Sequence, residues 1–150
     1  MPILTDLDCD AVYSSPYLRA LNTARPFAAS KQFNLQIVED LHERVLSPVP
    51  RSDWLDHLRH SFSDPADALP GGESKEQARK PGLVALAAIS AAGHARPVVV
   101  SHGNLIASLL AGMDARFGDE DWAQMANPDV FTLTLENGKP AGWVRPRMVG

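Results

Sequence analysis

Arg19 is the first residue in the sequence whose type and position suggest phosphate chemistry. It stands four residues before Thr23, so the two side chains share a face if this segment is helical. Ser15 and Pro16 are typical of a helix start, which places Arg19 in the first turn, near the positive end of the helix dipole. A guanidinium offers a rigid, bidentate fork to phosphate oxygens. We therefore expect Arg19 to bind phosphate; the alternative for any single arginine is an exposed side chain that covers its neighbours.

His102 follows three consecutive valines and precedes Gly103. The valines predict a buried strand, so the imidazole would lie at the carboxyl end of that strand, the edge of an open α/β sheet where ligands bind. Gly103 lets a ligand approach the backbone, and the helix start that follows favours an anion. His102 could donate to a phosphoryl oxygen or shuttle a proton; it could also merely cap the strand. The neighbouring Ser101 lacks the Gly-x-Ser-x-Gly pattern of a serine hydrolase.

Glu43 lies in the segment Leu41-His42-Glu43-Arg44, after a second predicted strand. A carboxylic acid close to a phosphate site can protonate a leaving oxygen, whereas a loop glutamate elsewhere is solvated. The other histidines show no metal-ligand spacing with cysteines or carboxylates. We expect neither a metal nor a cofactor. These histidines are His42, His57, His60 and His94.

The elements that must position these residues alternate between strands and helices. Ser74 and Gln77 form a capping-box pattern before an alanine-rich helix, in which Pro81-Gly82 predicts a kink or a division into two helices. Ser52 is expected to cap a helix that carries Trp54 and Phe62. The Asn137-Gly138 pair predicts a hairpin turn. The expected strands are 11–13, 35–38, 97–100, 130–135 and 142–144, and the expected helices are 16–30, 52–62, 74–93, 103–110 and 119–125.

This alternation predicts an α/β fold with a mainly parallel sheet flanked by helices. The 150 residues suit one domain, 1–150, and no linker divides them. The net charge of -4 gives no basic field for nucleic acid or anionic lipid. Cys9 is the single cysteine, and the N-terminal residues resemble neither a signal peptide nor a membrane span. We expect a cytoplasmic protein whose partner is a small phosphorylated molecule, with no nucleic acid and no membrane.

The motifs together resemble one family, the histidine phosphatases (phosphoglycerate-mutase-like). Residues 14–24 are similar to its Ser-Pro-x-x-Arg-Ala-x-x-Thr-Ala segment, and residues 41–44 to its Leu-x-Glu-Arg segment. Residues 71–74 and 98–103 resemble its Gly-Gly-Glu-Ser segment and its strand ending in Ser-His-Gly. The resemblance implies phosphomonoester hydrolysis through a phosphohistidine without a metal. Arg19 and His102 would then hold the phosphoryl group, and Glu43 would be the general acid.

The family's nucleophilic histidine belongs to an Arg-His-Gly motif on a first, central strand, and this sequence contains no Arg-His-Gly. We therefore expect an N-terminally truncated domain without that strand, and impaired catalysis. The local imitation Arg59-His60-Ser61 falls within a predicted helix and lacks the glycine. The alternative is a non-catalytic module that binds phosphorylated ligands or recruits a partner strand, with a homo-oligomer through the sheet gap as one form. The sequence distinguishes neither the substrate nor mutase from phosphatase activity.

Overall fold

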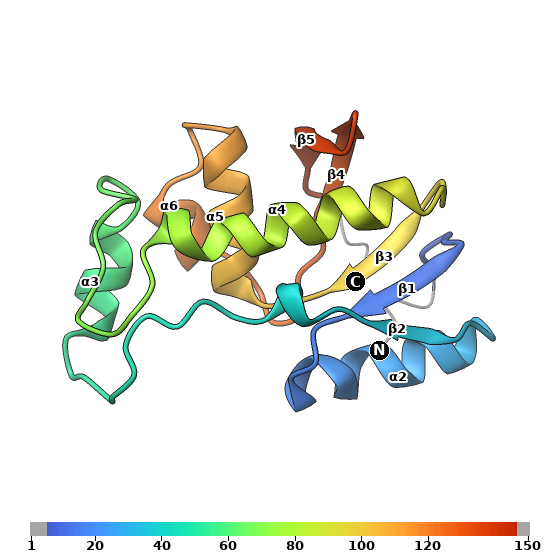
Figure 1. Ribbon diagram of the computed structural model, residues 1–150, viewed down its shortest axis with the longest axis horizontal. Helices are drawn as coiled ribbons and strands as arrows, with labels where there is room; N and C mark the ends of the chain where they lie inside the picture. Colours follow the sequence, from blue (N-terminus) through green and yellow to red (C-terminus); the bar gives the residue numbers. More distant parts are fainter. Residues whose placement is uncertain (1–5, 147–150) are drawn as a thin grey trace.

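The strand β1 (Ala11–Ser14) is the centre of a parallel sheet in the order β2-β1-β3. The structure is a computed structural model that describes residues 6–146. β2 (Leu35–Ile37) and β3 (Pro97–Val100) pair with opposite edges of β1, and the three strands lie side by side in Figure 1. The predicted α/β fold with a small parallel sheet is confirmed.

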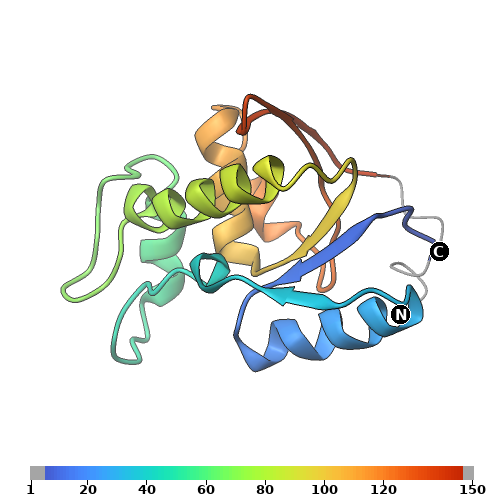
Figure 2. The ribbon, with the colours of Figure 1, turned by 45° about the vertical axis from the view of Figure 1, so that its right-hand side comes forward.

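Helices cover both faces of this sheet, as Figure 2 shows. Because side chains alternate along a strand, Val12 packs against Phe27 of α2 (Leu18–Ser30), on one face. Tyr13 belongs to a cluster with Ile89 of α4 (Lys75–Ala91), on the other face. The alternating side chains of β1 therefore contribute to one apolar layer on each face of the sheet, and these two layers hold the strands in place.

The helix α4 begins as the sequence predicts. The Ser74 hydroxyl accepts a hydrogen bond from the backbone N–H of Gln77, and the Gln77 side chain accepts one from the N–H of Ser74. The predicted division at Pro81 is wrong, because α4 runs as one helix through it. Gly82 lets α4 pack closely on α5 (Gly103–Met113): a Cβ there would lie 3.2 Å from a methyl carbon of Leu105.

Two predicted helix caps are displaced. The helix α2 begins at Leu18 after Tyr17, so Ser15 is not its N-cap, and the Ser15 hydroxyl instead accepts a hydrogen bond from the N–H of Tyr17. The helix α3 (Trp54–His60) begins after Asp53 rather than after Ser52. A short 3-10 turn, η1 (Glu39–Leu41), connects β2 to the segment that carries Glu43.

The second half of the chain ends in a hairpin separate from the parallel sheet. After the short helix α6 (Asp119–Ala123), β4 (Thr132–Glu136) pairs antiparallel with β5 (Lys139–Val144). Asn137 and Gly138 both have positive φ, 52° and 76°, which suits the tight turn the sequence predicts. Of the helices in residues 6–146, none has the length and apolarity to cross a bilayer.

The strand β3 departs from its prediction as a buried strand, because all four of its residues are half-buried. Its Val100 carbonyl accepts a hydrogen bond from the N–H of Ser15, beyond the end of β1. Backbone groups alternate in direction along a strand, so those of Val99 face the opposite edge. Among the described strands, none pairs with that edge. The three-valine strand, whose composition suits a buried position, therefore has one unpaired edge.

Candidate active site

A cavity of about 1170 Å³ lies along the unpaired edge of β3, between this strand and β4. Residues of both strands line it, including Val99 and Leu133. Near the carboxyl end of β3, the same cavity is lined by Arg19, Glu43 and His102. The three side chains singled out in the sequence thus converge on one hollow.

His102 is held by the side chain of Ser15, a residue whose sequence position predicts a helix cap. The ring Nε2 atom lies 2.8 Å from the hydroxyl oxygen of Ser15, and both residues are buried. Because the Ser15 oxygen already accepts from the N–H of Tyr17, its own hydrogen is available to Nε2. This arrangement favours the neutral tautomer that carries its proton on Nδ1. Burial, then the charges of Arg19 and His42, lowers the pKa of His102 to about 4.

Tyr17 lies between the two candidate phosphate ligands. Its ring centroid is 5.1 Å from that of His102, and the guanidinium carbon of Arg19 lies 5.2 Å from the same ring centroid. A guanidinium over an aromatic ring is stabilised by the negative face of the ring. The residue before the helix therefore orients both groups, although its sequence position gave no signal of this contact.

Arg19 is exposed, and it forms no ion pair with any carboxylate in residues 6–146. Thr23, one turn later on α2, lines the same cavity, as their four-residue spacing predicts. A guanidinium that faces a cavity without a carboxylate partner leaves its donors open to an anion.

Glu43 is anchored to the start of α5. Its Oε1 atom accepts hydrogen bonds from the backbone N–H groups of Arg44 and Leu105, each at 2.8 Å. Its Oε2 atom accepts one longer bond, 3.1 Å, from the N–H of Asn104. The sequence predicts that this helix start binds a ligand anion. In the structure, the Glu43 carboxylate itself occupies two of the N–H groups there, those of Asn104 and Leu105.

The pKa of Glu43 reflects opposing influences. Burial raises it above the ordinary value, and the three backbone hydrogen bonds and the nearby Arg19 charge lower it by less. A half-buried carboxyl with a raised pKa binds a proton more readily than a fully solvated one, as a general acid must. Oε2 accepts a single bond, so it has a further lone pair for that proton.

Two contacts hold the Glu43 segment, one to the end of β3 and one to the loop before α4. The hydroxyl of Ser101 donates to the carbonyl of Leu41 at 2.8 Å, which joins the end of β3 to η1. The backbone N–H of Glu73 donates to the carbonyl of Val45 at 2.7 Å. Gly72 permits this approach, because a Cβ there would lie 2.1 Å from the carbonyl oxygen of Leu46. Ser101 thus positions the acid-bearing loop.

Arg44 and Lys75 form a buried basic pair behind Glu43. Arg44 donates to the hydroxyl of Ser61 at 3.0 Å and to the carbonyl of Glu73 at 3.1 Å. The Lys75 ammonium is buried, has no hydrogen-bond partner, and lies 3.5 Å from the centroid of the Phe62 ring. Burial, followed by the charges of Arg44 and Arg79, lowers the pKa of Lys75 to about 7. These residues support the loop from outside the cavity.

The remaining histidines do not join the three site residues in a metal cluster. His57 contacts Asp53 at 2.9 Å and His60 contacts Asp64 at 3.9 Å, both on the surface around α3. His94 precedes β3 and lines the far end of the cavity. Within residues 6–146, no three His, Cys, Asp or Glu side chains are grouped to hold a metal ion.

Comparisons with known proteins identify one family and several solved structures with the same fold. The model of the histidine phosphatase superfamily (branch 1) matches residues 2–143. Among curated proteins, none matches. A mycobacterial glucosyl-3-phosphoglycerate phosphatase solved with VO3 is similar in structure, with a TM-score of 0.72, 22% identity, and coverage of 98% of this chain and 79% of that one.

Two further solved structures share the fold. Bacillus stearothermophilus YhfR has a TM-score of 0.69 and 22% identity, with coverage of 91% of this chain and 73% of that one. The alpha-ribazole phosphatase of Shigella flexneri has a TM-score of 0.62 and 23% identity, with coverage of 93% and 74%. Each of these solved chains is longer than the part that this chain matches.

Proposed function

This chain belongs to the histidine phosphatase superfamily, and we propose that its cavity binds the phosphoryl group of a small phosphomonoester. The observation that carries the proposal is the convergence of Arg19, Glu43 and His102 on the cavity at the carboxyl end of β3. That edge is where parallel α/β sheets bind ligands. The structurally similar glucosyl-3-phosphoglycerate and alpha-ribazole phosphatases support the same class of substrate.

In this proposal Arg19 and His102 hold the phosphoryl oxygens. The unpaired guanidinium supplies positive charge and two parallel donors. The Ser15 contact leaves Nδ1–H of neutral His102 as a donor to a phosphoryl oxygen. A phosphate dianion bound beside the ring would stabilise the imidazolium and raise the His102 pKa. Charge stabilisation then comes from side chains, without a metal.

Glu43 is the proposed general acid. As the bond between phosphorus and the ester oxygen breaks, the leaving oxygen takes the proton held on the Glu43 carboxyl. The carboxylate that results is stabilised by its three backbone donors and by Arg19, which lies close enough to lower its pKa. The same carboxylate can then accept a proton from the water that hydrolyses a phosphohistidine.

A phosphohistidine mechanism also requires a nucleophilic histidine, and the described residues that line the cavity offer no candidate for it. The histidines that line the cavity are His94 and His102. His102 already contacts Ser15 through Nε2, and His94 lies beyond the amino end of a four-residue strand, roughly 13 Å away. In-line attack requires a nucleophile opposite the leaving group. We propose that residues 1–150 alone hydrolyse phosphomonoesters negligibly.

A second candidate function is a non-catalytic module that binds phosphorylated ligands or a partner strand. The unpaired edge of β3 beside an open cavity favours it, because an extended segment could bond to the Val99 backbone there. A homo-oligomer through this gap is one form of that proposal.

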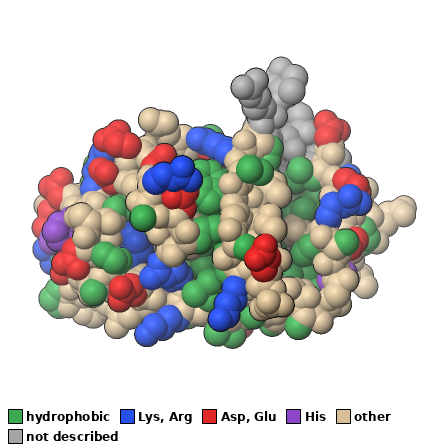
Figure 3. All heavy atoms as spheres, turned by 90° about the horizontal axis from the view of Figure 1, so that it is seen from above, with side chains coloured by type: hydrophobic (Ala, Val, Ile, Leu, Met, Phe, Trp, Pro, Cys, Tyr) green, Lys and Arg blue, Asp and Glu red, His purple; other side chains and the backbone are tan. Residues whose placement is uncertain are grey.

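The proposed partner is a small phosphorylated molecule, neither a nucleic acid nor a membrane. In Figure 3 the face seen from above carries basic and acidic side chains interspersed, and the net charge is -4. Such a surface does not attract polyanions. The single cysteine, Cys9, suits the proposed cytoplasmic location.

The test is a steady-state assay with 4-nitrophenyl phosphate. We compare residues 1–150 with a version extended at the N-terminus by a strand that ends in Arg-His-Gly, and with the same version after His→Ala in the added motif. Turnover in the extended version that the His→Ala change abolishes is the expected result. Equal turnover in the unextended chain, lost on His102→Ala, would contradict the missing-nucleophile assignment.

A further inference from the structure

Apolar side chains line the cavity beside the phosphate ligands. Leu55 of α3, Ile106 of α5, Trp122 of α6 and Met125 all do so. A Cβ placed on Gly103 would meet the terminal methyl group of Met125 at 3.9 Å, so this side chain lies over the residue next to His102. The Leu55 side chain is 38% exposed.

Ion pairs fix two of these apolar walls opposite each other. Arg59 of α3 contacts Asp119 at 2.9 Å and Glu120 at 3.0 Å, both on α6. Leu55 is one turn before Arg59 on α3, and Trp122 is one turn after Asp119 on α6. Residues one turn apart share a helix face, so the ion pairs bring Leu55 and Trp122 to the two sides of the same hollow.

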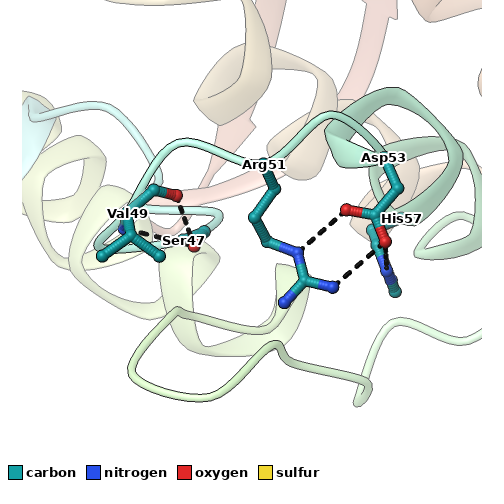
Figure 4. Close-up of polar contacts among 5 residues, drawn as sticks. All are labelled: Ser47, Val49, Arg51, Asp53 and His57. Carbon is teal, nitrogen blue, oxygen red and sulfur yellow. Dashed lines mark hydrogen bonds and ion pairs between the residues drawn. The ribbon is translucent and has the colours of Figure 1, made fainter.

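Ion pairs also neutralise positive charge in the cavity. Three arginines line it, and two are neutralised: Arg59 by α6, and Arg96 by Asp8 at 2.7 Å. Among the described residues that line the cavity, Arg19 is therefore the arginine that remains available to bind an anion. Outside this cavity, Arg51 is also paired, through two nitrogens, with Asp53, as Figure 4 shows.

We propose that the substrate is a phosphomonoester whose leaving group is an uncharged alkyl or aryl alcohol, bound against Leu55, Trp122 and Met125. This inference rests on the proposed function, because Arg19 and His102 must hold the phosphoryl group first. A leaving group with a second phosphate or carboxylate finds no unpaired arginine here and would lose its hydration against apolar walls. An apolar leaving group gains from the same burial.

Binding of phosphonates tests the inference without requiring turnover. We titrate methylphosphonate, phenylphosphonate and 3-phosphonopropionate at pH 8 into the full chain by NMR. Phenylphosphonate should bind roughly tenfold more tightly than methylphosphonate, since small apolar groups in a pocket give gains of that order. The carboxylate of 3-phosphonopropionate, a second anionic group beside its phosphonate, should give no gain in affinity over methylphosphonate.

The variants Leu55→Ser and Met125→Gln should each reduce the phenyl advantage at least about threefold, because they weaken phenylphosphonate binding more than methylphosphonate binding. The matched control is Leu83→Ser, because Leu83 is 36% exposed and lies outside this cavity. It should change neither affinity. Equal affinity for phenyl- and methylphosphonate, or a phenyl advantage that survives both variants, would overturn the inference alone. Failure of all three phosphonates to bind, or methylphosphonate binding that Arg19→Ala leaves unchanged, would overturn the proposed function and the inference with it.

Discussion

The Nε2 atom of His102 lies 2.8 Å from the Oγ atom of Ser15, so the ends of two adjacent parallel strands are joined by a buried side-chain hydrogen bond. Ser15 follows β1 and His102 follows β3. The serine positions the imidazole, while its backbone N–H donates to Val100. The orientation of the His102 ring therefore depends on the pairing of β1 with β3.

Ser15→Ala should release the His102 ring without removing it from the cavity. Loss of one neutral hydrogen bond costs about 1 kcal/mol, so phosphate affinity should fall roughly fivefold. Nitrogen-15 NMR of the ring should show that the single Nδ1–H tautomer becomes a mixture. Ser30→Ala is the control, because the Ser30 hydroxyl bonds to Phe27 at the far end of α2. An unchanged tautomer signal in Ser15→Ala would refute the positioning role.

His102 should remain neutral at pH 7 in the free protein. Burial and the nearby positive charges lower its pKa to about 4, so its NMR resonances should shift near that pH rather than near 6.5. Saturating phosphate should move the titration upward, because the bound anion favours the imidazolium. The titration is measured with and without phosphate. A His102 pKa near 6.5 in the free protein, or a pKa that phosphate does not change, would contradict a phosphate site at His102.

Glu43→Gln should destabilise the protein as well as remove the proposed acid. Glutamine has one acceptor oxygen, and its amide group would face backbone N–H donors at the start of α5. Loss of charge-assisted bonds costs about 1–3 kcal/mol, measured as the free energy of unfolding in urea. The exposed Glu76 on α4 provides the control Glu76→Gln, for which no comparable loss is expected. Equal stability of the two variants would show that the Glu43 contacts contribute little.

Lys75 should make the stability of the protein rise with pH. Its folded-state pKa is lowered to about 7, and its unfolded-state pKa is near 10.4, so the unfolded chain binds more protons between these values. The free energy of unfolding should therefore increase from pH 7 to 10 by up to about 1.4 kcal/mol per pH unit. Lys75→Met should remove this rise, whereas Lys80→Met, at an exposed position on the same helix, should preserve it. Identical pH profiles for the two variants would contradict the assignment.

Much of the fold follows from local sequence patterns, and the candidate site residues also come from such patterns. Three valines predict β3, the Ser74–Gln77 box predicts the start of α4, and Asn137-Gly138 predicts the hairpin, because each depends on neighbouring residues alone. Arg19 and His102 are candidates because each occurs where a strand is followed by a helix.

The contacts that complete the site depend on distant residues and could not be predicted in this way. Ser15 has the sequence context of a helix cap, and its contact with His102 exists because β1 and β3 are adjacent. The carboxylate of Glu43 binds the start of α5, a contact that a loop sequence does not encode. Pro81 was expected to interrupt α4, yet packing against α5 at Gly82 accompanies one continuous helix.

The most direct test of the central claim is a titration of inorganic phosphate into the chain and two arginine variants on α2. Arg19→Ala removes the unpaired guanidinium that lines the cavity, and Arg25→Ala removes an exposed arginine on the same helix that does not line it. One charge-assisted contact contributes about 1.5–3 kcal/mol, so Arg19→Ala should weaken phosphate binding roughly tenfold or more, and Arg25→Ala should leave it unchanged. Equal phosphate affinity in the unaltered chain and in Arg19→Ala would contradict a phosphoryl site built on Arg19 and His102.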